Sequence, residues 1–164
     1  MQDSLFVSVE QPLQTEISSL LKQSDAVAAT LYPGEYRRPI TAESLAKPDT
    51  HVIVARIAGR TAGLCVLFDR GDRSVELKRK IVDSDARGAG VGKALLRGAE
   101  THALKLGAET ILLEVGTRNV EAQQLYRRAG FQICEPFSPY KATPISLFMV
   151  SHLKETDAGL SAGR

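Results

Sequence analysis

The chain lacks several features that mark whole classes of protein. It has two cysteines in 164 residues, Cys65 and Cys134, and they lie far apart in separate apolar runs. This spacing excludes a disulfide scaffold and a paired-cysteine zinc site, and it predicts buried thiols in a reducing compartment. The three histidines are scattered, without metal-ligand or catalytic-triad spacing. The sequence therefore predicts no metal site.

Long apolar runs and a strong excess of one charge are also missing. No run approaches the about 18 residues that a membrane helix needs, so no membrane span is predicted. The net charge of +2 does not favour nucleic acid as a partner. The first residues, M-Q-D-S-L-F-V, lack the basic and apolar regions of a signal peptide, so a cytoplasmic location is expected.

What is present is typical of one globular domain. The composition, 43% hydrophobic and 24% charged, gives a chain of this length a sizeable core. We expect a single domain over residues 1–154. Residues 155–164 are polar and contain glycine, which predicts a disordered tail.

A glycine-rich stretch, V-D-S-D-A-R-G-A-G-V-G-K at residues 82–93, follows a strand pattern and precedes a helix pattern. Its glycines are Gly88, Gly90 and Gly92. Unpaired N–H groups at a helix start, with Arg87 and Lys93 beside them, are suited to bind a phosphate. Two familiar phosphate loops are excluded. Arg87 occupies the first glycine position of a P-loop, and Lys93 occupies the third glycine position of a dinucleotide fingerprint.

Hydrophobic periodicity and turn residues predict the remaining elements. Strands are expected at residues 5–9, 52–57, 62–68, 75–82, 111–115, 131–134 and 145–150. Helices are expected at residues 13–31, 91–106 and 120–129, with one or two helical turns at 41–46. This order predicts a mixed α/β sheet with helices on both faces.

Two blocks carry a family resemblance. The first is R-x-x-G-x-G from Arg87, and the second is N-x-x-A-x-x-L-Y-x-x-x-G-F from Asn119. Together, in this order and spacing, they resemble the GNAT (GCN5-related) N-acetyltransferases. The stretch that begins at Gly130, G-F-Q-I-C-E-P-F, is similar to a subgroup of small bacterial acetyltransferases.

The resemblance implies a GNAT fold, with a mostly antiparallel sheet in which one parallel pair of strands splays apart to hold acetyl-CoA. It also implies that coenzyme A contacts two strand residues, the glycine loop, an asparagine and a tyrosine. These are Ile81, Val82, Arg87, Gly88, Ala89, Gly90, Val91, Gly92, Lys93, Asn119 and Tyr126. The alternative for Asn119 is a helix N-cap, for which asparagine is well suited.

The resemblance further implies that Tyr126 is a general acid, which returns a proton to the departing CoA thiolate. The alternative is a half-buried tyrosine on an amphipathic helix. Two carboxylates are candidates for the general base. Glu114 comes first, because it interrupts an apolar strand where an unpaired carboxylate is costly. Glu76 comes second, and its alternative role is a salt bridge with Lys78 or Lys80.

Acceptor recognition is expected from the two loops outside these blocks, residues 32–39 and 135–143. The candidate residues are Tyr32, Tyr36, Arg37, Arg38, Phe137 and Tyr140. Aromatic side chains there would form a small pocket, and either arginine would suit a carboxylate on the amine. Packing beneath the loops explains the aromatics equally well.

The resemblance therefore predicts an N-acetyltransferase that uses acetyl-CoA and acts on a small-molecule amine by direct transfer in a ternary complex. Two alternatives stay open: an acetyltransferase of protein N-termini or lysines, and a module that binds acyl-CoA without turnover. A homodimer also stays open.

Overall fold

The computed structural model describes residues 4–32, 34 and 40–154. The helices are α1 (Thr15–Leu31), α2 (Val91–Lys105) and α3 (Val120–Arg128), with 3₁₀ turns η2 (Glu43–Leu45) and η3 (Ser84–Ala86). The strands are β1 (Leu5–Glu10), β2 (Thr50–Ile57), β3 (Arg60–Asp69), β4 (Ser74–Val82), β5 (Thr110–Gly116), β6 (Gln132–Cys134) and β7 (Ser146–His152). The predicted order of elements is confirmed. The predicted tail lies outside the described residues.

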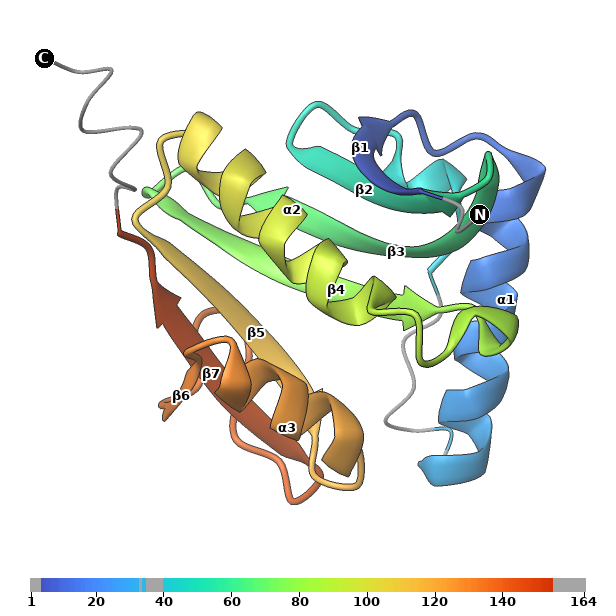
Figure 1. The fold of residues 1–164 in the computed structure, drawn as a ribbon. Helices are drawn as coiled ribbons and strands as arrows, with labels where there is room; N and C mark the ends of the chain where they lie inside the picture. Colours follow the sequence, from blue (N-terminus) through green and yellow to red (C-terminus); the bar gives the residue numbers. More distant parts are fainter. Residues whose placement is uncertain (1–3, 33, 35–39, 155–164) are drawn as a thin grey trace, which may run out of the picture.

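The strands form one seven-stranded sheet in the order β1-β2-β3-β4-β5-β7-β6. β4 and β5 are parallel, and every other neighbouring pair is antiparallel. A parallel pair needs a crossover connection, and α2 provides it. Figure 1 shows α2 and α3 on the same side of the sheet, with α2 over the first strands and α3 over β5 and β7. The order of elements predicts the mixed sheet, and the family resemblance implies its one parallel pair; both are confirmed.

Alternation along the strands gives the molecule two apolar layers. On one face, α2 packs its stripe of Leu95, Ala99 and Ala103 against the sheet. On the other face, α1 packs Ile17 and Leu20 together with neighbouring apolar residues. Helices therefore cover both faces, as the sequence predicts. No helix in the described part of the chain is long and apolar enough to cross a membrane.

The sheet opens between β4 and β5. These strands are paired over four residue pairs, which end at Leu77 and Leu113. Beyond that point β4 bulges, because Arg79 adopts a φ of 56° and the register with β3 shifts. β5 instead continues along β7 as far as Gly116. Figure 1 shows the two strands diverging, which is the splay that the family resemblance implies.

The bulge also changes which face successive side chains of β4 occupy. Lys78 lies opposite Val66 on the α1 side, and its Nζ is 5.1 Å from the centroid of the Phe68 ring. Lys80 lies on the opposite side, with Nζ 5.8 Å from the centroid of the Tyr126 ring. Strict alternation would place both lysines on one face. The bulge therefore directs one cation to each side of the opening.

Candidate active site

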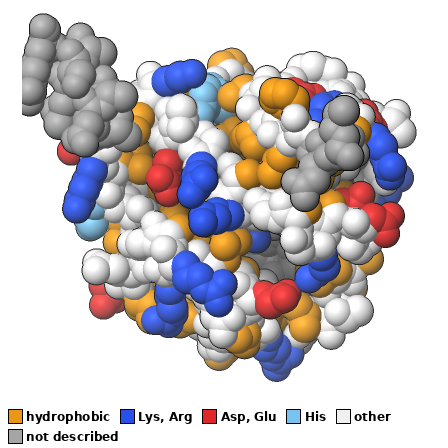
Figure 2. Space-filling view, in the orientation of Figure 1, with side chains coloured by type: hydrophobic (Ala, Val, Ile, Leu, Met, Phe, Trp, Pro, Cys, Tyr) orange, Lys and Arg blue, Asp and Glu red, His pale blue; other side chains and the backbone are white. Residues whose placement is uncertain are grey.

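A groove of about 1570 Å³ occupies the opening. Its walls come from β4, β5, the glycine loop, the N-terminal part of α2, the length of α3 and the second half of α1. Figure 2 shows its mouth as a hollow with lysine and arginine side chains beside it. Pockets for one small ligand usually measure about 300–1,000 Å³. This groove therefore has room for a long ligand together with a second, smaller one.

The glycine loop holds the N-terminus of α2 at one end of the groove. Gly90 is the N-cap of α2 and has a φ of 79°, a left-handed conformation that favours glycine. A Cβ atom at this position would have no atom within 4 Å, so the space in front of the loop is open. Unpaired N–H groups of the first helical turn follow directly. This arrangement fits a phosphate group.

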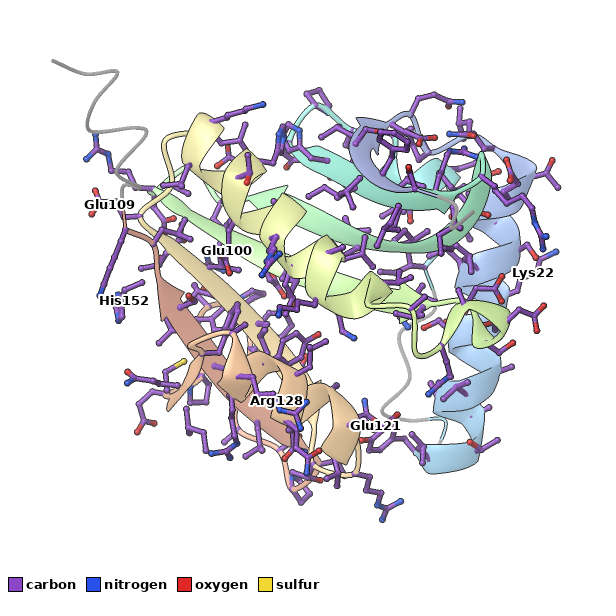
Figure 3. All side chains as sticks on the ribbon, in the orientation of Figure 1. Lys22, Glu100, Glu109, Glu121, Arg128 and His152 are labelled. Atoms are coloured by element: carbon purple, nitrogen blue, oxygen red, sulfur yellow. The ribbon has the colours of Figure 1, made fainter. Side chains whose placement is uncertain are left out.

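Arg87 and Glu121 form an exposed ion pair across the mouth of the groove, with 3.1 Å between Nη1 and Oε2. Figure 3 shows Glu121 on α3, at the edge of the opening. Exposed pairs of this kind contribute little to stability. The Arg87 guanidinium therefore remains available to an anionic ligand. Lys93 lines the same end of the groove.

Tyr126 lies on α3 and is 6% exposed. Its ring packs against Phe131, with 5.6 Å between the ring centroids. Among the described residues its hydroxyl has no hydrogen-bond partner, although the residue lines the groove. Burial raises the pKa of the Tyr126 phenol far above its ordinary value, so the group stays protonated. A neutral phenol with a free donor is a competent proton source.

Asn119 occupies the N-cap position of α3, but its side chain makes no capping hydrogen bond. The Gln123 amide instead donates to the carbonyl oxygens of Gly116, at 2.8 Å, and Thr117, at 3.0 Å. The Asn119 side chain lines the groove and is free to contact a ligand there. Asn119 therefore occupies the N-cap position without capping α3 through its side chain, and it also lines the groove.

The two candidate bases have different surroundings. Glu76 is 4% exposed and accepts a 2.7 Å hydrogen bond from the Tyr140 hydroxyl. Burial is the main cause that raises the pKa of Glu76. Lys78 Nζ lies 3.9 Å from the same carboxylate, so the predicted salt bridge is present at long range. Glu76 therefore has the environment expected of a catalytic base.

Glu114 is exposed and accepts a 2.5 Å hydrogen bond from the Ser146 hydroxyl. The premise that it is a buried, unpaired carboxylate is wrong. Its side of β5 faces the opening, where the sheet no longer continues into β4. Glu114 still lines the groove, close enough to Glu76 to raise the pKa of that carboxyl further.

The predicted acceptor loops are only partly described. Tyr36, Arg37 and Arg38 lie outside the described residues. Tyr32 packs against Gly116, and its hydroxyl accepts a 3.1 Å hydrogen bond from the Arg118 N–H.

Phe137 and Tyr140 belong to the second predicted loop and form an edge-to-face pair, 5.3 Å between centroids. Both also pack against Phe148 of β7. Tyr140 reaches the groove, and it connects this aromatic cluster to Glu76.

Cys65 lies beneath the groove and is fully buried. Burial raises the pKa of its thiol to about 12. A thiol with this pKa is a poor nucleophile at neutral pH. Among the residues that the structure describes, no cluster of three or more metal-ligating side chains occurs.

Comparison with known proteins identifies the fold and the family. The acetyltransferase (GNAT) family matches residues 17–131. An IAA acetyltransferase from Azospirillum brasilense is 36% identical over 144 residues, which cover 87% of this chain and 94% of that protein. The uncharacterized N-acetyltransferase YsnE from Bacillus subtilis is 27% identical over 151 residues, 91% of this chain and 100% of that protein.

Two solved structures share the fold. A Klebsiella pneumoniae protein assigned as an acyl-CoA N-acyltransferase superposes with a TM-score of 0.78 at 26% identity, over 92% of this chain and 98% of the other. The PaiA N-acetyltransferase from Thermoplasma acidophilum was solved with coenzyme A. It superposes with a TM-score of 0.75 at 18% identity, over 91% of this chain and 99% of the other. With the splayed parallel pair and the glycine loop, these matches show that the chain belongs to the GNAT family of acetyltransferases.

Proposed function

We propose that this N-acetyltransferase transfers the acetyl group of acetyl-CoA to a primary amine of a small molecule, by direct attack in a ternary complex. The observation that carries the proposal is the groove. It joins an anion-binding helix start, a buried phenol and a buried carboxylate in one continuous space. Its volume is sufficient for two substrates at once.

The glycine loop, residues 87–93, is proposed to bind the pyrophosphate of coenzyme A. Left-handed Gly90 leaves the N–H groups of the first helical turn open to the ligand. The peptide groups near Ile81 and Val82 lie where β4 has left β5, so they are available to the pantetheine arm. Asn119 is positioned to contact that arm from α3.

Glu76 and Tyr126 are proposed to move the two protons of the reaction. Glu76 accepts a proton from the attacking amine, and its raised pKa makes it a stronger base than an exposed glutamate. The amine nitrogen then forms a bond to the acetyl carbon. The carbon–sulfur bond breaks with its electron pair on sulfur, and the Tyr126 hydroxyl supplies the proton. Glu114 is left as the second candidate base, reached through water.

The acceptor is proposed to bind on the α1 side of the opening. Tyr32 on one side and Tyr140 with its aromatic cluster on the other line that end of the groove. A relative named IAA acetyltransferase supports a small-molecule acceptor. A compact pocket with aromatic walls suits a small amine better than a folded protein surface.

A panel of acceptors tests the proposal. Small amines, peptides with free N-termini and lysine-containing peptides are each incubated with acetyl-CoA, and release of the CoA thiol is measured. We expect the fastest release with a small amine. Faster release with a peptide would contradict the small-molecule acceptor. Binding of acetyl-CoA without release for any amine would indicate the non-catalytic alternative.

The Tyr140–Glu76 hydrogen bond predicts a pH effect. Glu76 must be ionised to act as a base, so kcat/KM falls as the pH falls through its raised pKa. The hydrogen bond from Tyr140 opposes that rise. Tyr140→Phe is therefore expected to raise the pKa of Glu76 and to move the acidic limb of kcat/KM to higher pH. Glu76→Gln is expected to abolish most of the activity, and the acidic limb should be absent from the activity that is left. A limb that stays in place in Tyr140→Phe would assign the titration to another group.

A further inference from the structure

Lys80 is a cation inside the groove without a matching anion. It projects from β4 toward α3, on the opposite side from Lys78, because of the bulge at Arg79. Its side chain is half-buried, and burial lowers the pKa of its ammonium group. Partly buried charges are costly unless they are paired. The position therefore needs an explanation beyond a solvated face.

The charged and titratable groups around Lys80 do not neutralise it. Cys65 on β3 is a neutral thiol, with a pKa of about 12. Glu121 on α3 is paired with Arg87 of the glycine loop. Tyr126 presents its ring face to the ammonium group and keeps its phenol proton. Within the described part of the chain, Lys80 has no salt-bridge partner.

The ammonium group lies between the start of α2 and the proposed acid. A Cβ atom on Gly92 would lie 3.6 Å from Lys80 Nζ, and the centroid of the Tyr126 ring lies 5.8 Å from it. Arg87 and Lys93 also line the groove but are exposed, whereas Lys80 is half-buried. A phosphate at the mouth would meet those two, whereas Lys80 faces the inner part beside Tyr126.

We infer that Lys80 stabilises the negative charge that forms on the sulfur of coenzyme A when the acetyl group leaves. This inference rests on the proposed function. As the carbon–nitrogen bond forms and the carbon–sulfur bond breaks, the electron pair stays on sulfur, and Tyr126 donates its proton there. Lys80 keeps its own proton and supplies the positive charge. It is needed because a buried phenol, with its raised pKa, gives up a proton reluctantly.

Binding of coenzyme A and of desulfo-coenzyme A, which lacks only the sulfur, tests this inference. Affinities are measured for the wild type, Lys80→Met and Lys80→Arg, near the ordinary thiol pKa of about 8.5. Lys80→Met keeps the length of the side chain and removes its charge. We expect it to weaken the binding of coenzyme A by about tenfold and the binding of desulfo-coenzyme A by less than about twofold. The two losses differ because the Lys80 charge and the ligand's sulfur take part in one interaction. Lys80→Arg keeps the positive charge, so it is expected to keep most of the difference in affinity between coenzyme A and desulfo-coenzyme A.

The matched control is Lys22→Met, which removes an exposed charge on the outer side of α1 (Figure 3). It should leave both affinities unchanged, and the melting temperatures of all variants establish that they are folded. Equal losses for the two ligands in Lys80→Met would overturn the inference, because Lys80 would then contact the phosphates or the arm. Unchanged affinities would overturn it as well. If the wild type bound neither ligand, the proposed function itself would fail.

Discussion

Replacing Tyr126 with phenylalanine is expected to lower kcat by about 10²–10⁴, the usual contribution of general acid catalysis. The substitution keeps the ring that packs against Phe131 and removes only the hydroxyl. Without that hydroxyl, the thiolate must leave unprotonated or take its proton from water. Steady-state kinetics with saturating acetyl-CoA and the preferred amine measure the effect.

The same variant supplies its own structural control. The Tyr126 hydroxyl has no hydrogen-bond partner among the described residues, so its removal should leave the melting temperature nearly unchanged. The affinity for acetyl-CoA should also change little, because the proton moves only in the transition state. A kcat equal to that of the wild type would show that Tyr126 is a packing residue or that chemistry is not rate-limiting.

Gly90→Asp is expected to abolish the rise in melting temperature that acetyl-CoA gives the wild type. The new side chain would project into open space, so the fold can accept it. Aspartate also tolerates the left-handed conformation better than most residues. Its carboxylate would stand where the pyrophosphate is proposed to bind, and like charges repel. ATP and NAD should raise the wild-type melting temperature much less than acetyl-CoA does.

Gly107→Asp is the matched control for that experiment. Gly107 has a φ of 82° and open space around it, like Gly90, but it lies beyond the C-terminal end of α2, away from the groove. Both variants carry the same backbone strain and the same added charge. Gly107→Asp should therefore keep the full thermal shift. If acetyl-CoA still raised the melting temperature of folded Gly90→Asp, the proposal that the loop binds the pyrophosphate would be contradicted.

The fold was accessible from the sequence because its signals are local. The apolar stripe of α2, the glycines that follow helices and the hairpin at Ala58–Gly59 each depend on a few neighbouring residues. The separation of β4 from β5 follows only from the family resemblance that the two motif blocks carry, because no local sequence pattern indicates where a parallel pair of strands separates. Strand ends differ from the predictions by one or two residues, in most cases because pairing extends into flanking polar positions, whereas β6 and β7 begin one residue later than predicted.

The site was less accessible, because its important contacts are long-range. Tyr140 and Glu76 are 64 positions apart, and nothing near either residue indicates their hydrogen bond. The sequence favours Glu114 because a carboxylate in an apolar strand is expected to be buried, but the strand is uncovered at the opening and Glu114 is exposed. The sequence offers Lys80 only as a possible salt-bridge partner of Glu76. The bulge at Arg79 directs Lys80 into the groove, and no glycine or other turn residue in the sequence indicates that bulge.

The separation of β4 from β5 also bears on how the molecule avoids aggregation. A strand that loses its neighbour presents unpaired peptide groups, and such edges readily recruit strands from other molecules. Here both edges are recessed between α1 and α3, and Lys78 and Lys80 place charge on the two sides of β4. Lysines are a common means of blocking strand addition. The walls and charges that form the groove therefore oppose the addition of a strand from a second molecule.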